Sequence, residues 1–170
     1  MSEPRGRIVE DTALCRLSPE RLFDLLVDPN ERQKWDLCPP WIALEPVEAP
    51  PGPALEGARY TARGKARGIG FVGTAFVMAS DRPHRYRIRS ETKFERAFPD
   101  AASIEEYRIE PAGTGSRVHY TMTIVKTPGT GAFLTRLVSA LLEPFVTARA
   151  AKRNFRETLG YAEKHAGMAT

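Results

Sequence analysis

The chain has 170 residues, of which 42% are hydrophobic and 27% charged, and its net charge is +4. This length fits one domain, so we expect a single domain over residues 1–170 with a core at about residues 7–165. A domain of this size can bury a substantial apolar core. Disulfide bridges are therefore not required to stabilise the fold.

The charge pattern argues against nucleic acid as a partner. The densest basic run, within residues 82–96, is interrupted by Glu91 and Glu95. On a strand, Arg85, Arg87 and Arg89 would share one face with Glu91, which is typical of a solvated outer face.

No membrane span, metal site or cofactor is indicated. The longest apolar stretch, residues 133–146, is about half the length that a bilayer needs, and it contains charged residues. Cys15 and Cys38 have no second pair to complete a zinc site, and no two histidines lie close together. Because residues 1–7 precede no apolar signal-peptide segment, we expect a cytoplasmic protein.

The first third of the chain predicts a strand followed by two short helices. Residues 8–16 contain β-branched side chains and no helix signal. Ser18 then offers an N-cap, with Pro19 at the first helical position. A second short helix is expected at residues 31–35, and the prolines between residues 39 and 53 leave room for only one short strand, near residues 41–44.

The middle of the chain predicts a meander of antiparallel strands. Turn-forming residues at 81–84 and 111–115 separate strand-like segments, so consecutive strands should pair as hairpins. With the two strands already described, the total is about seven. The five expected segments are residues 59–66, 70–81, 85–93, 101–111 and 117–126.

Residues 130–165 predict one long helix, roughly 50 Å in length at 1.5 Å per residue. Apolar residues recur along one side of it, and the stripe is broadest in the front half. Pro144 should bend its axis near residues 140–143. A bent helix of this kind needs a curved sheet to lie against.

Residues 68–73 match the dinucleotide-binding glycine pattern letter for letter. That site requires a helix to open at the last glycine, so that its amides meet the pyrophosphate. Here a β-branched, strand-like segment follows, so we interpret the glycines as a hairpin turn or bulge.

The order of elements and several local strings resemble the SRPBCC superfamily of START-like, helix-grip proteins, and within it the polyketide cyclase/dehydrase and lipid-transport group. The strings are residues 17–29 followed by Trp35, the turn at 80–86, residues 107–111 with 115–118, and the closing stretch at 155–163. The resemblance implies an α+β fold in which a seven-stranded antiparallel curved sheet wraps around a long C-terminal helix. It also implies a cavity between them for an apolar small molecule.

Strand alternation identifies the side chains that would face this cavity. Tyr107 and Ile109 share a face with Glu105, and Tyr120 lies on the corresponding face of the next strand. A one-residue bulge would reverse these faces. The candidate ligand-binding residues are Trp35, Trp41, Tyr86, Ile88, Tyr107, Ile109, Val118, Tyr120, Met122, Leu134, Leu137, Val138, Leu141 and Phe145.

Three kinds of function remain open. The first is a monomeric or homodimeric carrier that binds a hydrophobic, lipid- or polyketide-like molecule. The second is an aromatase/cyclase-type enzyme, in which Glu105, Tyr107 or Tyr120 would move protons. The third is a protein-interaction module. A buried Glu105 would be unfavourable unless it were hydrogen-bonded or protonated, so its surroundings distinguish a site residue from a wrong strand register.

Overall fold

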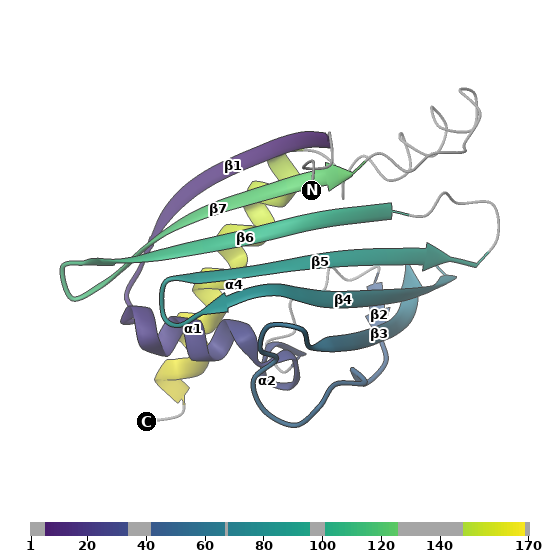
Figure 1. Cartoon of the computed structure of the whole chain (residues 1–170), viewed down its shortest axis with the longest axis horizontal. Helices are drawn as coiled ribbons and strands as arrows, with labels where there is room; N and C mark the ends of the chain where they lie inside the picture. The colour runs from purple at the N-terminus through teal and green to yellow at the C-terminus, as the bar shows by residue number, and fades with distance from the viewer. Residues whose placement is uncertain (1–5, 34–41, 67, 96–100, 126–147, 169–170) are drawn as a thin grey trace.

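The computed structural model describes residues 6–33, 42–66, 68–95, 101–125 and 148–168. Seven described strands form one antiparallel sheet in the order β1-β7-β6-β5-β4-β3-β2. Its elements are β1 Gly6–Cys15, α1 Pro19–Val27, α2 Pro29–Gln33, β2 Ile42–Leu44, β3 Arg59–Ala66, β4 Ile69–Asp81, β5 Arg85–Phe94, β6 Ala101–Ala112, β7 Gly115–Val125 and α4 Ala148–Met168. Figure 1 shows α4 crossing one face of the sheet, with α1 and α2 near one end of it. The predicted α+β fold and order of elements are confirmed.

The start of α1 follows the predicted capping pattern. The Ser18 hydroxyl accepts a hydrogen bond from the backbone N–H of Arg21, and Pro19 occupies the first turn. Ser18 thereby satisfies one of the donors that a helix start leaves without a partner. The apolar side of α1, including Leu22, Phe23 and Leu26, is buried in the core.

Hairpins connect the strands from β3 to β7, as the turn residues predict. Gly68 lies between β3 and β4 with a φ of 83°, a conformation that side chains other than glycine rarely adopt. The glycine pattern at residues 68–73 therefore belongs to a turn and the strand after it. One irregularity in pairing occurs in β4 between Val77 and Ala79, whereas β5, β6 and β7 pair without a shift.

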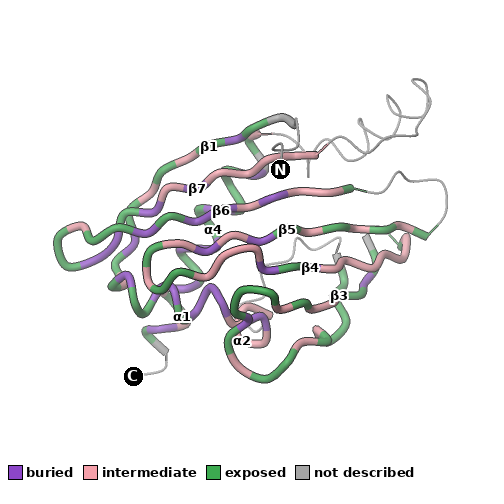
Figure 2. Tube along the Cα trace, in the orientation of Figure 1, coloured by how far each residue is buried: buried purple, intermediate pink, exposed green. Residues whose placement is uncertain are grey.

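The core lies between the inner face of the sheet and the helices, as the buried segments in Figure 2 show. From α4, Phe155, Leu159 and Ala162 are each no more than 3% exposed. The predicted helix is thus confirmed over residues 148–165 and continues to Met168. Its front half and the predicted bend at Pro144 lie outside the described residues.

The described residues contain neither a helix suited to cross a membrane nor a group of side chains suited to hold a metal ion. Among the helices in this part of the chain, none has an apolar stretch long enough to cross a bilayer. Nor do three or more His, Cys, Asp or Glu side chains gather there as a metal site would require.

Candidate functional site

Three tyrosines form a row across the inner face of the sheet. Tyr86 lies opposite Tyr107 in the β5–β6 pair, and Tyr107 lies opposite Tyr120 in the β6–β7 pair. Directly opposite residues of antiparallel strands share one face, so all three side chains point toward the helices. Each of them is at most 4% exposed.

Glu105 lies on the same inner face, between Ile88 of β5 and Met122 of β7. One of its carboxylate oxygens, Oε2, accepts hydrogen bonds from Tyr107 at 3.1 Å and from Tyr120 at 3.2 Å. The side chain is only partly buried. The two hydrogen bonds offset the unfavourable burial of a carboxylate. Since β5, β6 and β7 pair without a shift, the polar contact does not result from a wrong register.

Helix α4 covers this polar group with an aromatic ring. The Phe155 ring stacks on Tyr120 with a centroid distance of 4.7 Å and an interplanar angle of 7°. It also contacts the Tyr107 ring at 6.3 Å. At the other end of the row, Phe23 of α1 meets Tyr86 edge to face. The tyrosine rings are therefore fixed by apolar contacts, while the hydroxyls of Tyr107 and Tyr120 point to Glu105.

Arg32 of α2 joins the cluster from outside the sheet. Its partly buried side chain interacts with the Tyr107 hydroxyl, and its charge also acts on Glu105, Tyr60 and Tyr86. Burial lowers the pKa of Arg32, but these surrounding groups outweigh burial, so the pKa lies above its usual value. The guanidinium thus stays charged although it is partly removed from water.

The short helix α2 is held in place by polar contacts at both ends. Asp28 accepts hydrogen bonds from the backbone N–H groups of Asn30 and Glu31. The Gln33 side chain accepts from the backbone of Val47 and donates to the carbonyl of Glu45. Glu31 lies 3.1 Å from the His165 ring near the end of α4. These contacts fix the backbone from which Arg32 extends.

The pKa values of the four tyrosines in the cluster are raised, chiefly because burial disfavours a phenolate. For Tyr107 and Tyr120, the negative charge of Glu105 adds to burial. For Tyr86, the next contribution comes from Tyr60, whose own pKa is raised by burial. All four therefore remain protonated hydrogen-bond donors at neutral pH.

The structure places the remaining candidates in two groups. Ile88, Ile109 and Val118 are buried with the tyrosines on the inner face, and Met122 packs against them. The other candidates lie outside the described residues: Trp35, Trp41, Leu134, Leu137, Val138, Leu141 and Phe145.

Sequence reasoning missed two members of the cluster, Arg32 and Tyr60. Tyr60 shares a face with Ala62 in β3, so strand alternation could have identified it. Arg32 lies in a polar five-residue helix with no periodic pattern, and no signal in the sequence marks it.

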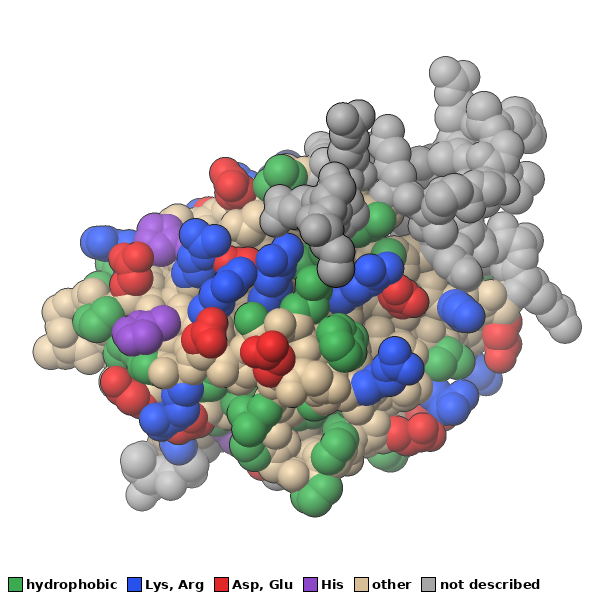
Figure 3. Space-filling view, in the orientation of Figure 1, with side chains coloured by type: hydrophobic (Ala, Val, Ile, Leu, Met, Phe, Trp, Pro, Cys, Tyr) green, Lys and Arg blue, Asp and Glu red, His purple; other side chains and the backbone are tan. Residues whose placement is uncertain are grey.

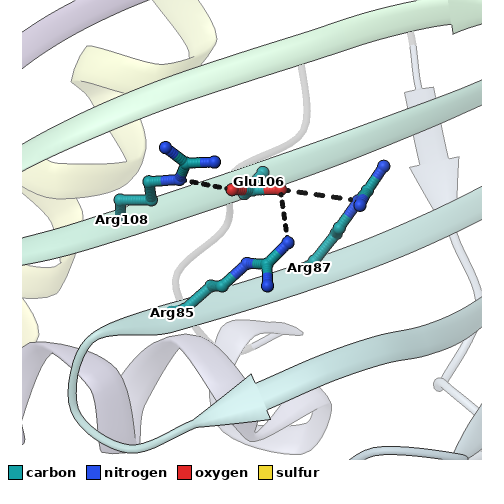
Figure 4. Close-up of polar contacts among 4 residues, drawn as sticks. All are labelled: Arg85, Arg87, Glu106 and Arg108. Atoms are coloured by element: carbon teal, nitrogen blue, oxygen red, sulfur yellow. Dashed lines mark hydrogen bonds and ion pairs between the residues drawn. The ribbon is translucent and has the colours of Figure 1, made fainter. Parts of the chain in front are cut away.

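The outer face carries a separate cluster around Glu106, shown in Figure 4. The Glu106 carboxylate contacts Arg85 at 3.2 Å, Arg87 at 3.5 Å and also Arg108. Elsewhere on this face, Lys and Arg side chains are interspersed with Asp and Glu (Figure 3). Mixed charges of this kind are typical of a solvated sheet face, as the spacing of the arginines in β5 predicts.

The architecture defines the helix-grip class, in which a curved antiparallel sheet packs against a C-terminal helix. The family model described as "Polyketide cyclase / dehydrase and lipid transport" matches residues 7–166. The chain therefore belongs to this family of the SRPBCC superfamily, as its resemblance implies. No curated protein matches the sequence.

Solved structures share the fold at low sequence identity. A protein from Rhodobacter sphaeroides superposes with a TM-score of 0.65 at 15% identity, covering 99% of this chain and 97% of that one. Protein Ms6760 from Mycobacterium smegmatis gives a TM-score of 0.64 at 16% identity, with 99% of both chains covered. Ara h 8.0201 gives 0.60 at 15% identity, covering 93% of this chain and 98% of that one. Family and fold together indicate a protein that binds a hydrophobic ligand.

Proposed function

We propose that the protein binds a lipid-like or polyketide-like small molecule between the inner face of the sheet and its C-terminal helix. The observation that carries this proposal is the hydrogen-bonded group of Glu105, Tyr107 and Tyr120, which lies beside buried apolar residues of the inner face. In this arrangement, apolar side chains hold the body of the ligand and the polar group orients one end of it.

The chemistry of the inner face supports a binding role over a purely structural one. Ile88, Ile109, Val118 and Met122 would supply the apolar contact area, worth about 25 cal/mol for each Å² removed from water. A carboxylate contributes nothing to such a surface and is unfavourable there unless it is hydrogen-bonded. Glu105 is therefore better explained as a group that recognises a polar atom of a ligand.

A second candidate function is cyclisation of a reactive chain within the same space. The observation that favours it is the contact between a carboxylate and two phenols, because such groups can pass protons to and from a substrate. We nevertheless favour the carrier.

The two functions are separated by measuring affinity and product formation in the same variants. For a carrier, Tyr107→Phe should change the affinity for a neutral apolar fluorophore, N-phenyl-1-naphthylamine, by about 0.5–1.5 kcal/mol, one hydrogen bond. Glu105→Gln should change this affinity by only slightly more. For an enzyme, either substitution should lower turnover of a poly-β-ketone substrate by about a hundredfold or more, with binding nearly intact.

Matched controls exist for both substitutions. Tyr161, which is 38% exposed on α4, provides Tyr161→Phe, and the exposed Glu157 provides Glu157→Gln. Neither control should alter binding. A turnover loss above about tenfold in the Glu105 or Tyr107 variant, without a matching loss of affinity, would overturn the carrier assignment. Failure of the unmodified protein to bind any apolar probe would overturn both functions.

The proposal includes a cytoplasmic location and a monomeric or homodimeric state, with no role for nucleic acid. Burial raises the pKa of the Cys15 thiol to about 11, so this thiol stays protonated at neutral pH.

A further inference from the structure

The polar cluster on the inner face has more hydrogen-bond donors than acceptors. Tyr107 and Tyr120 both use their O–H groups on Glu105. The hydroxyls of Tyr60 and Tyr86 interact with each other, which occupies only one of their two O–H groups. Among the described residues, no other acceptor is in contact with this pair, so the remaining O–H can donate to an acceptor from a ligand.

Arg32 adds a larger surplus of hydrogen-bond donors to the cluster. A guanidinium carries five N–H donors and no acceptor. Its contact with the Tyr107 hydroxyl oxygen uses a small part of that capacity. Among the described residues, no carboxylate lies in ion-pair contact with it, and Glu105 acts on it only through charge.

The surroundings make this surplus significant. Arginines on the outer face, such as Arg85 and Arg108, are paired with a carboxylate and reach water. Arg32 instead extends from α2 toward Tyr86 and Tyr107, which are at most 2% exposed. Since removing a charge from water is unfavourable without a partner, its position favours an anion supplied by the bound molecule.

We propose that the ligand is an amphipathic anion whose carboxylate pairs with Arg32, while its apolar body lies along the inner face of the sheet. This inference rests on the proposed function and narrows its ligand class. Guanidinium and carboxylate form two parallel N–H···O bonds, and the spare tyrosine O–H of the Tyr60–Tyr86 pair supplies a further donor. A neutral alcohol of the same length offers neither the charge nor the second oxygen.

The test compares dodecanoate with 1-dodecanol at pH 7.5, by displacement of N-phenyl-1-naphthylamine from the full chain. The unmodified protein should bind dodecanoate at least about tenfold more tightly, which corresponds to 1.4 kcal/mol. Arg32→Gln should abolish this preference while leaving the affinity for 1-dodecanol within about threefold. Arg32→Lys keeps the charge but lacks the planar fork, so it should retain part of the preference.

Arg59→Gln is the matched control, because Arg59 is exposed at the start of β3 and is directed to the outer face. It should leave both affinities unchanged. Circular dichroism verifies that each variant is folded, and if Arg32→Gln does not fold, Arg32→Lys and the unmodified protein still give the comparison.

Equal affinity for dodecanoate and 1-dodecanol in the unmodified protein would show that the protein does not recognise a negative charge on the ligand. The proposed function would then remain intact. A preference for dodecanoate that survives in Arg32→Gln would also overturn the role of Arg32. If neither probe binds, the proposed function itself fails, and this inference fails with it.

Discussion

Glu105 and Glu106 are neighbours in β6 that lie on opposite faces of the sheet and contact different partners. Glu105 faces the helices and accepts from two tyrosines, whereas Glu106 faces outward and is surrounded by arginines. The alternation of a strand is enough to separate them, because successive side chains point to opposite faces. One carboxylate therefore belongs to the inner tyrosine cluster, and the other contacts the outer arginines of β5 and β6.

We expect Glu106→Gln to lower the free energy of unfolding by about 2 kcal/mol, since it removes the carboxylate charge that Arg85 and Arg108 contact. The measurement is urea unfolding at pH 7. The control is Glu91→Gln, whose partner Arg89 is 45% exposed in its side chain, so the loss there should be below 1 kcal/mol. Equal losses in the two variants would contradict this prediction.

The pKa of Glu106 also predicts how the stability of the protein changes in acid. Burial raises the pKa of Glu106, but hydrogen bonds from Arg108 and Arg85 outweigh it, and the pKa lies below its usual value. The stability that Glu106 contributes is present above the unfolded-state pKa of about 4.3 and is lost as pH falls through the folded-state pKa. The difference in the free energy of unfolding between the unmodified protein and Glu106→Gln should therefore become smaller in acid.

At the scale of elements, α4 is attached to the sheet through one stripe. Phe155 contributes the ring that lies on Tyr120 and Tyr107, and Leu159 and Ala162 continue the contact. The opposite side of α4 carries exposed charges such as Arg153 and Glu157. A narrow stripe of this kind makes each buried side chain important for holding the helix.

Phe155→Ala should therefore cost about 3–5 kcal/mol of stability, the usual range for removing a buried aromatic side chain. Urea denaturation followed by circular dichroism measures it. Phe76→Ala provides the comparison, because Phe76 is 40% exposed on the outer side of β4, and its loss should stay near or below 1 kcal/mol. If Phe155→Ala cost as little as Phe76→Ala, the helix would not depend on this contact.

At the scale of the whole molecule, the tyrosines link folding to alkaline pH. The chain has five tyrosines, and four of them have pKa values raised by burial in the cluster. A raised pKa means that the stabilising contribution is complete below the unfolded-state value of about 10 and is lost as pH rises above it. Alkali should therefore unfold the protein and ionise these four tyrosines together.

Absorbance at 295 nm during a titration from pH 8 to 12.5 tests this coupling. In Tyr161→Phe, which retains only the four cluster tyrosines, phenolate absorbance should rise in one cooperative step that coincides with loss of circular dichroism. Gradual ionisation of any of the four before unfolding would show that the cluster is open to solvent.

The sequence by itself determined the elements and the direction of their side chains. Strand alternation placed Tyr86, Ile88, Tyr107, Ile109, Val118 and Tyr120 inward, and Ser18-Pro19 marked the start of α1. These features depend on near neighbours along the chain, namely the two-residue period of a strand and the cap of a helix. Local patterns of this kind are readable without coordinates.

The tertiary structure alone decided which of these side chains meet. Arg32 reaches Tyr107 and Glu105 from a part of the chain more than seventy residues earlier, because α2 is fixed by contacts with Glu45, Val47 and His165. Nothing in the polar run around Arg32 distinguishes it from a solvated arginine. Its partners are determined by distances in space, and a one-dimensional pattern carries no record of them.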